Sequence, residues 1–327
     1  MFASELLDFI RQGSSFLIAG HKEPDGDCIG SQLALGSVLR RMGKKTVLCS
    51  AGPFKRIEIK PYESFFVSAP ARNDGDRVII VDCSTPDRTG ALEPFLEGHP
   101  AAIIDHHETG AECSQSCGLR RGSMIEHVED QAPSTTFLIL HLIQALGMEP
   151  NREEAELLFF GLCTDTGFFR HVDGSGAETF EAAASLIRCG ANPKAAYAAI
   201  HGGKSLDSRR LLGLVLNKTE SLFDGKLVIS SEEYEETCRF GQESRDSDSL
   251  YQLLQSVAGV EAIVIIRQET PENCTVGFRS RDWVDVGSIA ESFGGGGHKN
   301  AAGLSISGTI AGLKPLFIKA FKDIFQP

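Results

Sequence analysis

The alternation of short apolar runs with amphipathic helical segments constrains this fold most strongly. The apolar runs that predict buried strands lie at residues 15–19, 46–49, 77–81 and 101–104. Segments with helical periodicity are interleaved with them or follow them, at residues 31–42, 134–148, 152–162 and 177–189. Strands that alternate with helices predict an α/β fold with a doubly wound parallel sheet, covered on both faces.

A second, smaller α/β domain is predicted in the C-terminal part of the chain. A length of 327 residues is enough for two cores of ordinary size. The segment His201-Gly-Gly-Lys-Ser205 is the best candidate for a linker, and residues 206–220 form a helical pattern after it. Strand-like runs then return at 226–230, 262–267 and 275–279, interleaved with helical segments at 250–257, 286–293 and 310–325. We predict a first domain at 1–190, a linker with connecting helix at 191–220, and the smaller domain at 221–327.

Charge and hydropathy restrict the partners of the chain. A formal net charge of -12 disfavours binding of long duplex nucleic acid, which needs a positive surface, but allows a short phosphorylated substrate held by a few local cations. No stretch approaches the ~18–20 apolar residues of a membrane helix, and the N-terminal residues lack the pattern of a signal peptide. The 9 cysteines are scattered, and the close pair Cys113 and Cys117 is expected in a plain loop. We therefore expect a cytoplasmic protein without membrane association.

Histidine and aspartate residues gather where the predicted strands end. They are His21, Asp25 and Asp27 after the first strand, Asp82 after the third, and Asp105, His106 and His107 after the fourth. Asp165 joins them from the end of a helical segment. In an open parallel sheet, ligands bind outside the carboxyl ends of the strands. Three strands that deliver the same ligand chemistry to one edge predict a single site there.

The residue types at this edge indicate a metal centre. Carboxylates mixed with imidazoles, with no thiolate among them, suit manganese, with magnesium or cobalt as alternatives, better than a structural zinc ion. Four aspartates and two histidines are too many for one ion, and they fit two divalent cations ~3.5–4 Å apart that share a carboxylate, as in phosphoester hydrolysis. Asp82 is our candidate for the shared ligand because it is central. Asp105 is expected to orient its neighbours instead of binding metal.

Each of these residues has a simpler interpretation when it is taken alone. A lone aspartate after a strand, such as Asp25, most often caps a helix or forms a turn, and a lone His-His pair most often packs in the core or lies on the surface. Ser134-Thr-Thr136, after Pro133, predicts a helix cap. Four separate clusters of the same ligand types at strand ends favour the metal centre over these alternatives.

Candidate substrate contacts lie in both halves of the chain. The glycine run at 294–297 predicts backbone N–H groups that cradle an anion, or alternatively a tight connection between strands. Arginine side chains offer forked donors to a phosphate, with surface ion pairs or solvation as the alternative. The predicted contacts are Arg88, Arg279, Gly295, Gly296, Gly297 and His298, with Arg281 beside Arg279.

The ordered motifs resemble those of a known family. The matching residues are His21-Lys-Glu-Pro-Asp25-Gly-Asp27, Asp82, Asp105-His106-His107 and Thr164-Asp165-Thr-Gly167, together with Phe293-Gly-Gly-Gly-Gly-His298-Lys-Asn-Ala-Ala-Gly303. They resemble the DHH phosphoesterase superfamily and its DHH-associated substrate domain. The resemblance implies one metal held by His21, Asp25 and Asp82, a second held by Asp27, Asp82, His106 and Asp165, and His107 facing the substrate phosphate. Cys28 stands where alanine is usual in this family.

The size of the chain resembles the nanoRNase and pAp-phosphatase branch of that superfamily. The resemblance implies an enzyme that hydrolyses short oligoribonucleotides or dinucleotides to mononucleotides, and pAp to AMP. The alternatives are a cyclic-dinucleotide phosphodiesterase, an inorganic pyrophosphatase or polyphosphatase, a RecJ-type exonuclease, and a degenerate nucleotide-binding sensor. The sequence does not specify an oligomeric state, and it allows a homodimer.

Overall fold

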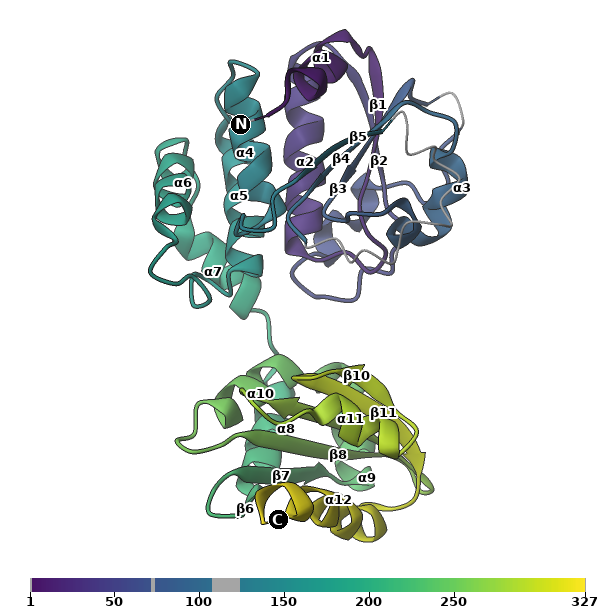
Figure 1. The fold of residues 1–327 in the computed structure, drawn as a ribbon, viewed down its shortest axis with the longest axis vertical. Coiled ribbons are helices and arrows are strands. Elements are labelled where there is room, and N and C mark those ends of the chain that lie inside the picture. Colours follow the sequence, from purple (N-terminus) through teal and green to yellow (C-terminus); the bar gives the residue numbers. More distant parts are fainter. Residues whose placement is uncertain (1, 72–73, 108–123, 327) are drawn as a thin grey trace. The chain divides into compact units, whose positions relative to one another are not determined.

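The structure is a computed structural model that describes residues 2–71, 74–107 and 124–326. It divides the chain into two compact units, Met1–Gly203 and Lys204–Pro327, and each unit has its own hydrophobic core (Figure 1). Cys113 and Cys117 lie outside the described residues. In the described parts of the chain, no helix is long and apolar enough to cross a membrane.

The N-terminal unit contains the predicted parallel sheet. Its five strands are in the order β2-β1-β3-β4-β5, and all neighbouring pairs are parallel. They are β1 (Ser15–Ala19), β2 (Lys45–Cys49), β3 (Arg77–Val81), β4 (Ala101–Asp105) and β5 (Met124–Val128). The strands β1, β3 and β4 are adjacent, so their carboxyl ends meet at one edge of the sheet. The predicted fold class is confirmed.

Both faces of this sheet are covered, as expected for strands that are apolar throughout. Phe16 and Ile18 of β1 pack on one face against the helices α1 (Ser4–Gln12), α2 (Gly26–Arg41), α4 (Thr135–Ala145) and α5 (Arg152–Asp165). The helices α6 (Ala177–Arg188) and α7 (Pro193–His201) add to this layer. Leu17 and Ala19 face the other side, toward the 3-10 helix η2 (Pro86–Leu92) and α3 (Glu93–Leu96). A further 3-10 helix, η1 (Lys60–Phe65), follows β2.

Glycines allow α2 and α5 to approach each other closely behind the site. A Cβ atom on Gly30 of α2 would lie 2.6 Å from the Leu157 carbonyl oxygen of α5, which is too close for any real contact. On α5, a Cβ atom on Gly161 would lie 2.4 Å from Thr136 Cγ2 and 3.1 Å from the Cα of Asp27. The two glycines therefore set the depth at which α2 presents Asp27.

A pair of glycine substitutions tests this helix contact. Gly30→Ala is expected to lower the free energy of unfolding of the N-terminal unit by about 1–3 kcal/mol, because the added methyl group forces the helices apart. Gly213→Ala, in α8 (Leu206–Asn217) of the other unit, meets no atom within 4 Å and is expected to add about 0.4–1 kcal/mol to the free energy of unfolding. Urea denaturation measures both changes. Equal changes in the free energy of unfolding, with the same sign, would contradict the conclusion that the close helix contact requires glycine at position 30.

The C-terminal unit is built on a mixed six-stranded sheet in the order β10-β11-β9-β8-β7-β6. Only the β7–β8 pair is parallel. The strands are β6 (Glu220–Leu222), β7 (Leu227–Glu232), β8 (Ala262–Thr270), β9 (Asn273–Ser280), β10 (Gly296–His298) and β11 (Ala301–Ser307).

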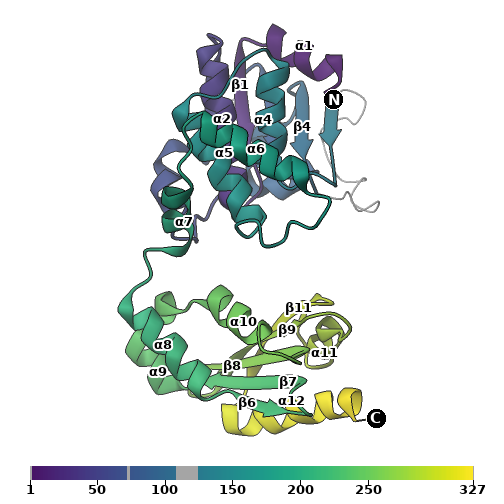
Figure 2. The ribbon, with the colours of Figure 1, turned by 90° about the vertical axis from the view of Figure 1, so that its left-hand side faces the viewer.

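The two faces of this second sheet have separate cores. One face packs against α8 (Leu206–Asn217), α9 (Tyr234–Phe240) and α10 (Ser247–Gln255), with a short 3-10 helix η4 (Gln242–Ser244) between the last two. The other face packs against α11 (Val286–Ser292) and α12 (Ile310–Phe325) (Figure 2). This unit is the smaller α/β domain that the sequence predicts.

Candidate metal centre

The structure brings the predicted ligand residues together at the carboxyl edge of the first sheet. His21 follows β1, Asp82 follows β3, and His106 follows β4. Two further carboxylates come from helices: Asp27 from the first turn of α2, and Asp165 from the last residue of α5. The donor atoms of Asp82, Asp105, His106 and His107 lie within 4.8 Å of one another, as do those of Asp27, His106 and Asp165.

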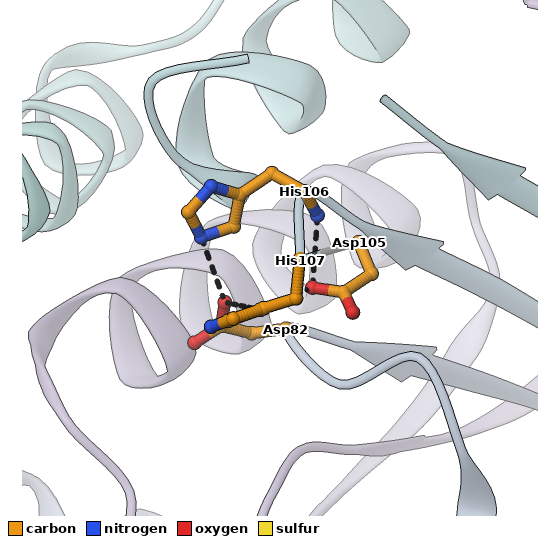
Figure 3. A group of neighbouring side chains, drawn as sticks. All are labelled: Asp82, Asp105, His106 and His107. Atoms are coloured by element: carbon orange, nitrogen blue, oxygen red, sulfur yellow. Dashed lines mark hydrogen bonds and ion pairs between the residues drawn. The ribbon is translucent and has the colours of Figure 1, made fainter. Parts of the chain in front are cut away.

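Asp82 contacts several residues of this cluster, and Figure 3 shows its contacts with His106 and His107. Its Oδ2 is 3.4 Å from His21 Nε2, and its Oδ1 is 3.6 Å from His106 Nε2. The two oxygens of one buried carboxylate therefore face two different histidines, as a shared ligand would. The backbone φ of Asp82 is 59°, a left-handed conformation that a non-glycine residue adopts at a cost of about 1–3 kcal/mol and that clusters at functional sites.

The N-terminus of α4 holds two of the carboxylates, a role that the sequence analysis missed. The backbone N–H groups of Thr135 and Thr136 donate to Asp27 at 2.6 and 2.9 Å, and the Thr136 hydroxyl donates to Asp27 at 2.6 Å. The Thr135 hydroxyl donates to Asp82 at 3.0 Å. Ser134 caps the helix as predicted, because its hydroxyl accepts from the backbone N–H of Phe137. The positive end of the helix thus stabilises the buried negative charge.

Asp25 caps a helix and also lies beside the other ligand candidates. Its Oδ1 accepts hydrogen bonds from the backbone N–H groups of Asp27 and Cys28, so Asp25 is the N-cap of α2. The same oxygen lies 3.9 Å from His21 Nε2. A helix cap therefore places this carboxylate beside the other ligand candidates.

Asp105 has the contacts that an orienting residue needs. It is fully buried, and its Oδ1 accepts from the backbone N–H of His106 at 2.8 Å. The same oxygen lies 2.8 Å from Nδ1 of His107, whose side chain is 40% exposed. The hydrogen bond to Asp105 raises the pKa of His107, partly opposed by burial and by the positive charge of Arg88. These contacts fix the His107 ring with its other nitrogen directed away from Asp105.

The electrostatics of the cluster fit divalent cations. Burial raises the pKa of Asp82 well above its ordinary value, with a further contribution from the charge of Asp27, and the same two causes raise the pKa of Asp165 to about 7. Among the described residues, the ion-pair partners of Asp25, Asp27, Asp82 and Asp165 are all histidines. The buried Nε2 of His106 has no hydrogen-bond partner, although Asp165 lies only 3.3 Å away. Metal ions would neutralise the carboxylates and use this free nitrogen.

Two arginines add positive charge around the cluster. Arg88, which was predicted, lies in η2 and acts on the pKa of His107. Arg56, which was not predicted, contributes to lowering the pKa of Asp25, and it also opposes the raised pKa of Asp165. It lies in the segment between β2 and η1, and no nearby motif in the sequence marks it. Both arginines are candidates for contact with an anionic substrate.

The predicted substrate residues Arg279 and His298 of the second unit lie on β9 and β10, two strands that both pair with β11. In the register of the sheet, Arg279 of β9 is opposite Ala301 of β11, which in turn is opposite His298 of β10. Side chains at directly opposed positions share a face, so Arg279 and His298 lie on the same side. Arg281 instead donates to the backbone carbonyl of Gln255.

The glycine run has a mixed role. A Cβ atom on Gly295 would lie 2.4 Å from the Leu304 side chain, and Gly297 has a φ of 147° with the backbone of Ala301 2.5 Å from its Cβ position. These two glycines are required by the strand connection itself. Gly296 has no atom within 4 Å of its Cβ position, so its packing does not require glycine. A backbone left open at Gly296 is consistent with a contact to a ligand.

Tyr251 of α10 supports Arg279, and the sequence analysis missed it. The Arg279 guanidinium lies over the Tyr251 ring, 4.5 Å from its centroid, and donates to the carbonyl of Phe278. A Cβ atom on Gly277 would lie 2.1 Å from the Tyr251 hydroxyl oxygen, so this glycine makes room for the ring. No sequence pattern connects positions 251 and 279, because the contact depends on how α10 packs on the sheet.

Paired substitutions test this support. Tyr251→Leu is expected to raise KM by about 5- to 30-fold, the equivalent of about 1–2 kcal/mol, because it removes the cation–π contact that holds Arg279. The value of kcat is expected to stay the same. Tyr251→Phe keeps the ring and is expected to keep the wild-type KM. Steady-state kinetics with a short oligoribonucleotide, the substrate that the sequence resemblance implies, measure both, and an equal loss in the two variants would contradict a role for the ring.

Comparison with known proteins agrees with this architecture. Residues 15–162 match the N-terminal domain of the DHH family, and residues 224–326 match the DHHA1 domain. The chain is 31% identical to the bifunctional oligoribonuclease and PAP phosphatase NrnA of Thermus thermophilus, over 89% of this chain and 84% of that protein. The chain belongs to the DHH family. It is therefore a DHH-family phosphoesterase, and the cluster around Asp82 could hold the divalent metal ions on which this family depends.

Other similar proteins differ from this chain in length or in named activity. The chain is 27% identical to the cyclic-di-AMP phosphodiesterase GdpP of Bacillus subtilis over 93% of its own length, but it spans only 46% of that protein. An exopolyphosphatase-related protein from Bacteroides fragilis has a similar fold, with a TM-score of 0.82, 22% sequence identity, and coverage of 99% of this chain and 98% of that one. The structural similarity confirms the fold, and neither similarity decides the substrate.

Proposed function

We propose that this DHH-family phosphoesterase hydrolyses short oligoribonucleotides and dinucleotides to mononucleotides, and pAp to AMP. The main observation in support is the cluster around the buried Asp82. The two carboxylate oxygens of Asp82 face different histidines, His21 and His106. The similarity to the oligoribonuclease and PAP phosphatase of Thermus thermophilus extends over most of both chains and supports this substrate class.

The proposed metal ligands follow from the cluster. His21, Asp25 and Asp82 would hold one ion, and Asp27, Asp82, His106 and Asp165 would hold the second, with manganese as the proposed metal. The chemistry that such ions supply when bound is polarisation of the phosphoryl group and activation of water. The protein contributes a rigid arrangement, because helix caps and the α4 N-terminus fix the carboxylates.

His107 is the proposed substrate contact beside the metal ligands. Its Nδ1 donates to the buried Asp105, so the other ring nitrogen can donate to a phosphate oxygen when the ring is protonated. The positive charges of Arg88 and Arg56 favour an anionic substrate at this edge of the sheet. His107 differs from an ordinary surface histidine because Asp105 fixes the orientation of its ring.

The second unit is proposed to carry substrate contacts of its own. Arg279 is stacked on Tyr251 and shares a sheet face with His298, so a guanidinium and an imidazole offer donors on the same face of the sheet, with β11 between their strands. Gly296 leaves the backbone beside His298 open. Together they suit a phosphate or ribose oxygen of a short nucleotide.

Hydrolysis of cyclic dinucleotides is the second candidate. It is favoured by the similarity to the cyclic-di-AMP phosphodiesterase of Bacillus subtilis, which extends over 93% of this chain. It ranks lower because the chain spans less than half of that protein.

Product analysis tests the proposal. The purified protein with manganese is incubated separately with pAp, pApA, a short RNA oligonucleotide, cyclic di-AMP and pyrophosphate. We expect mononucleotides from pApA and the RNA, and AMP from pAp. Turnover of cyclic di-AMP or of pyrophosphate alone would assign the chain to those activities instead. Binding of metal without turnover of any of these compounds would contradict the proposed function.

A further inference from the structure

A thiol lies within the proposed metal centre. The donor atoms of His21, Cys28 and Asp82 lie within 4.8 Å of one another, and this third group shares Asp82 with the first group described above. Cys28 is fully buried and occupies the first turn of α2, directly after Asp27. Three donors of this kind at this separation surround a position that one metal ion can occupy.

The local structure fixes Cys28 in this place. A Cβ atom on Gly20 would lie 2.2 Å from the sulfur, so the absence of a side chain at Gly20 creates the space for the thiol. On the other side, Cys28 Sγ lies 3.6 Å from Gln32 Oε1. The amide of Gln32 is itself held in place, because its Nε2 donates to the carbonyls of Ile18 at 2.8 Å and Cys49 at 2.9 Å. Gly20 and Gln32 therefore fix the position of the sulfur.

Other buried cysteines of this unit do not belong to such a donor group. Cys49, Cys83 and Cys163 are buried, and within the described residues none of them belongs to a group of three potential metal donors. Cys83 follows Asp82 in the chain and packs into the core on the far face of the sheet; burial raises the pKa of its thiol, and the charges of Asp82 and His21 also act on it. Burial is thus common for cysteine in this chain, and Cys28 differs because its sulfur lies within 4.8 Å of donor atoms of both His21 and Asp82.

We propose that Cys28 is a further metal ligand, which lets the position between His21 and Asp82 bind thiophilic divalent cations, Zn²⁺ or Cd²⁺, through nitrogen, sulfur and oxygen. On binding, the sulfur–metal bond forms as the thiol proton leaves to solvent, and no electron is transferred. This inference rests on the metal centre of the proposed function, and it adds a donor that changes which metals the centre prefers.

The consequence is a metal selectivity that depends on one atom. Soft thiolate ligands favour zinc and cadmium, whereas manganese is satisfied by carboxylates and imidazoles. Removal of the sulfur is therefore expected to weaken binding of Zn²⁺ by on the order of 10- to 100-fold. The affinity for Mn²⁺ is expected to change little. Zinc is expected to compete with manganese at this position more strongly in the wild-type protein than in a variant without the thiol.

Cadmium titration of the full chain tests the proposal directly. A thiolate–cadmium bond produces an ultraviolet charge-transfer absorption that oxygen and nitrogen ligands do not produce. We expect this absorption in the wild-type protein and in Cys49→Ala, a matched buried cysteine of the same unit, and its loss in Cys28→Ala. Absorption that persists in Cys28→Ala would overturn the proposal.

X-ray absorption of the zinc-loaded protein gives an independent readout. One sulfur neighbour at about 2.3 Å is expected in the wild type and none in Cys28→Ser, which keeps the size of the side chain. Circular dichroism confirms that the variants are folded, and Cys28→Ser replaces Cys28→Ala in both experiments if the alanine variant unfolds. Zinc bound without a sulfur neighbour would refute only the role of Cys28. A chain that binds neither manganese nor zinc would refute the metal centre and with it the proposed function.

Discussion

Asp82→Ala is expected to abolish hydrolysis, with a loss of at least roughly 10³-fold in kcat. The side chain is buried, and its two oxygens face His21 and His106 from opposite sides. Its removal takes a ligand from both proposed metal positions at once, whereas loss of a residue on one side leaves the other position intact. Hydrolysis of pApA with saturating manganese, followed by chromatography of the products, measures the loss.

Two control variants separate this effect from a loss of fold. Asp82→Asn keeps the shape of the side chain and the acceptor for Thr135, and it is also expected to be inactive because the amide is a poor metal ligand. Asp8→Ala removes an exposed carboxylate from α1 of the same unit, and it is expected to keep wild-type activity. An active and manganese-binding Asp82→Ala protein would disprove the shared-ligand assignment.

Removal of divalent metals is expected to stop the reaction completely and to destabilise the N-terminal unit. Without cations, Asp27 and Asp82 remain buried close together, and burial together with mutual repulsion raises the pKa of Asp82. A metal present at 100 times its dissociation constant adds about 2.7 kcal/mol to the free energy of unfolding. Thermal unfolding and activity are measured after dialysis against a chelator and again after manganese is restored.

The C-terminal unit is an internal control in that experiment. It contributes none of the proposed metal ligands, so its unfolding transition is expected to stay unchanged on dialysis. Activity that survives exhaustive dialysis against the chelator would contradict metal dependence. A fall in stability of the C-terminal unit alone would place the metal elsewhere.

Much of the first unit could be predicted because its strands are short apolar runs with clear ends. The runs at 15–19 and 77–81 coincide with β1 and β3. Parallel topology then places residues that follow different strands at the same edge, which is why His21, Asp82 and His106 could be grouped without a structure. The long helix α12, Ile310–Phe325, was also predicted with these bounds, because its apolar periodicity extends over several turns.

Other elements give a weak signal in the sequence. Strand β5, Met124–Val128, is only half buried at the edge of the sheet and contains Glu126 and His127, so no apolar run marks it. Strand β10 forms within the glycine run, where low β propensity hides it, and it is held by pairing with β11. The conformations of these segments depend on neighbours that are distant in the sequence.

The supporting contacts of the site could not be predicted for the same reason. Thr135 and Asp27 are 108 positions apart, and only the packing of α4 beside α2 brings them together. The pair Tyr251 and Arg279 depends in the same way on α10. The sequence thus indicates which residue types the chemistry needs, while the residues that hold them in place emerge from tertiary packing.

The number of manganese ions bound per chain shows whether Asp82 is shared between two metal ions. Equilibrium dialysis of the wild-type protein and Asp82→Ala, with metal measured by elemental analysis, gives this number for both. The assignment of Asp82 as a shared ligand predicts two ions per wild-type chain. It also predicts that Asp82→Ala loses both ions at the same concentration of free manganese. A wild-type chain that binds no manganese, or an Asp82→Ala chain that still binds two ions, would contradict it.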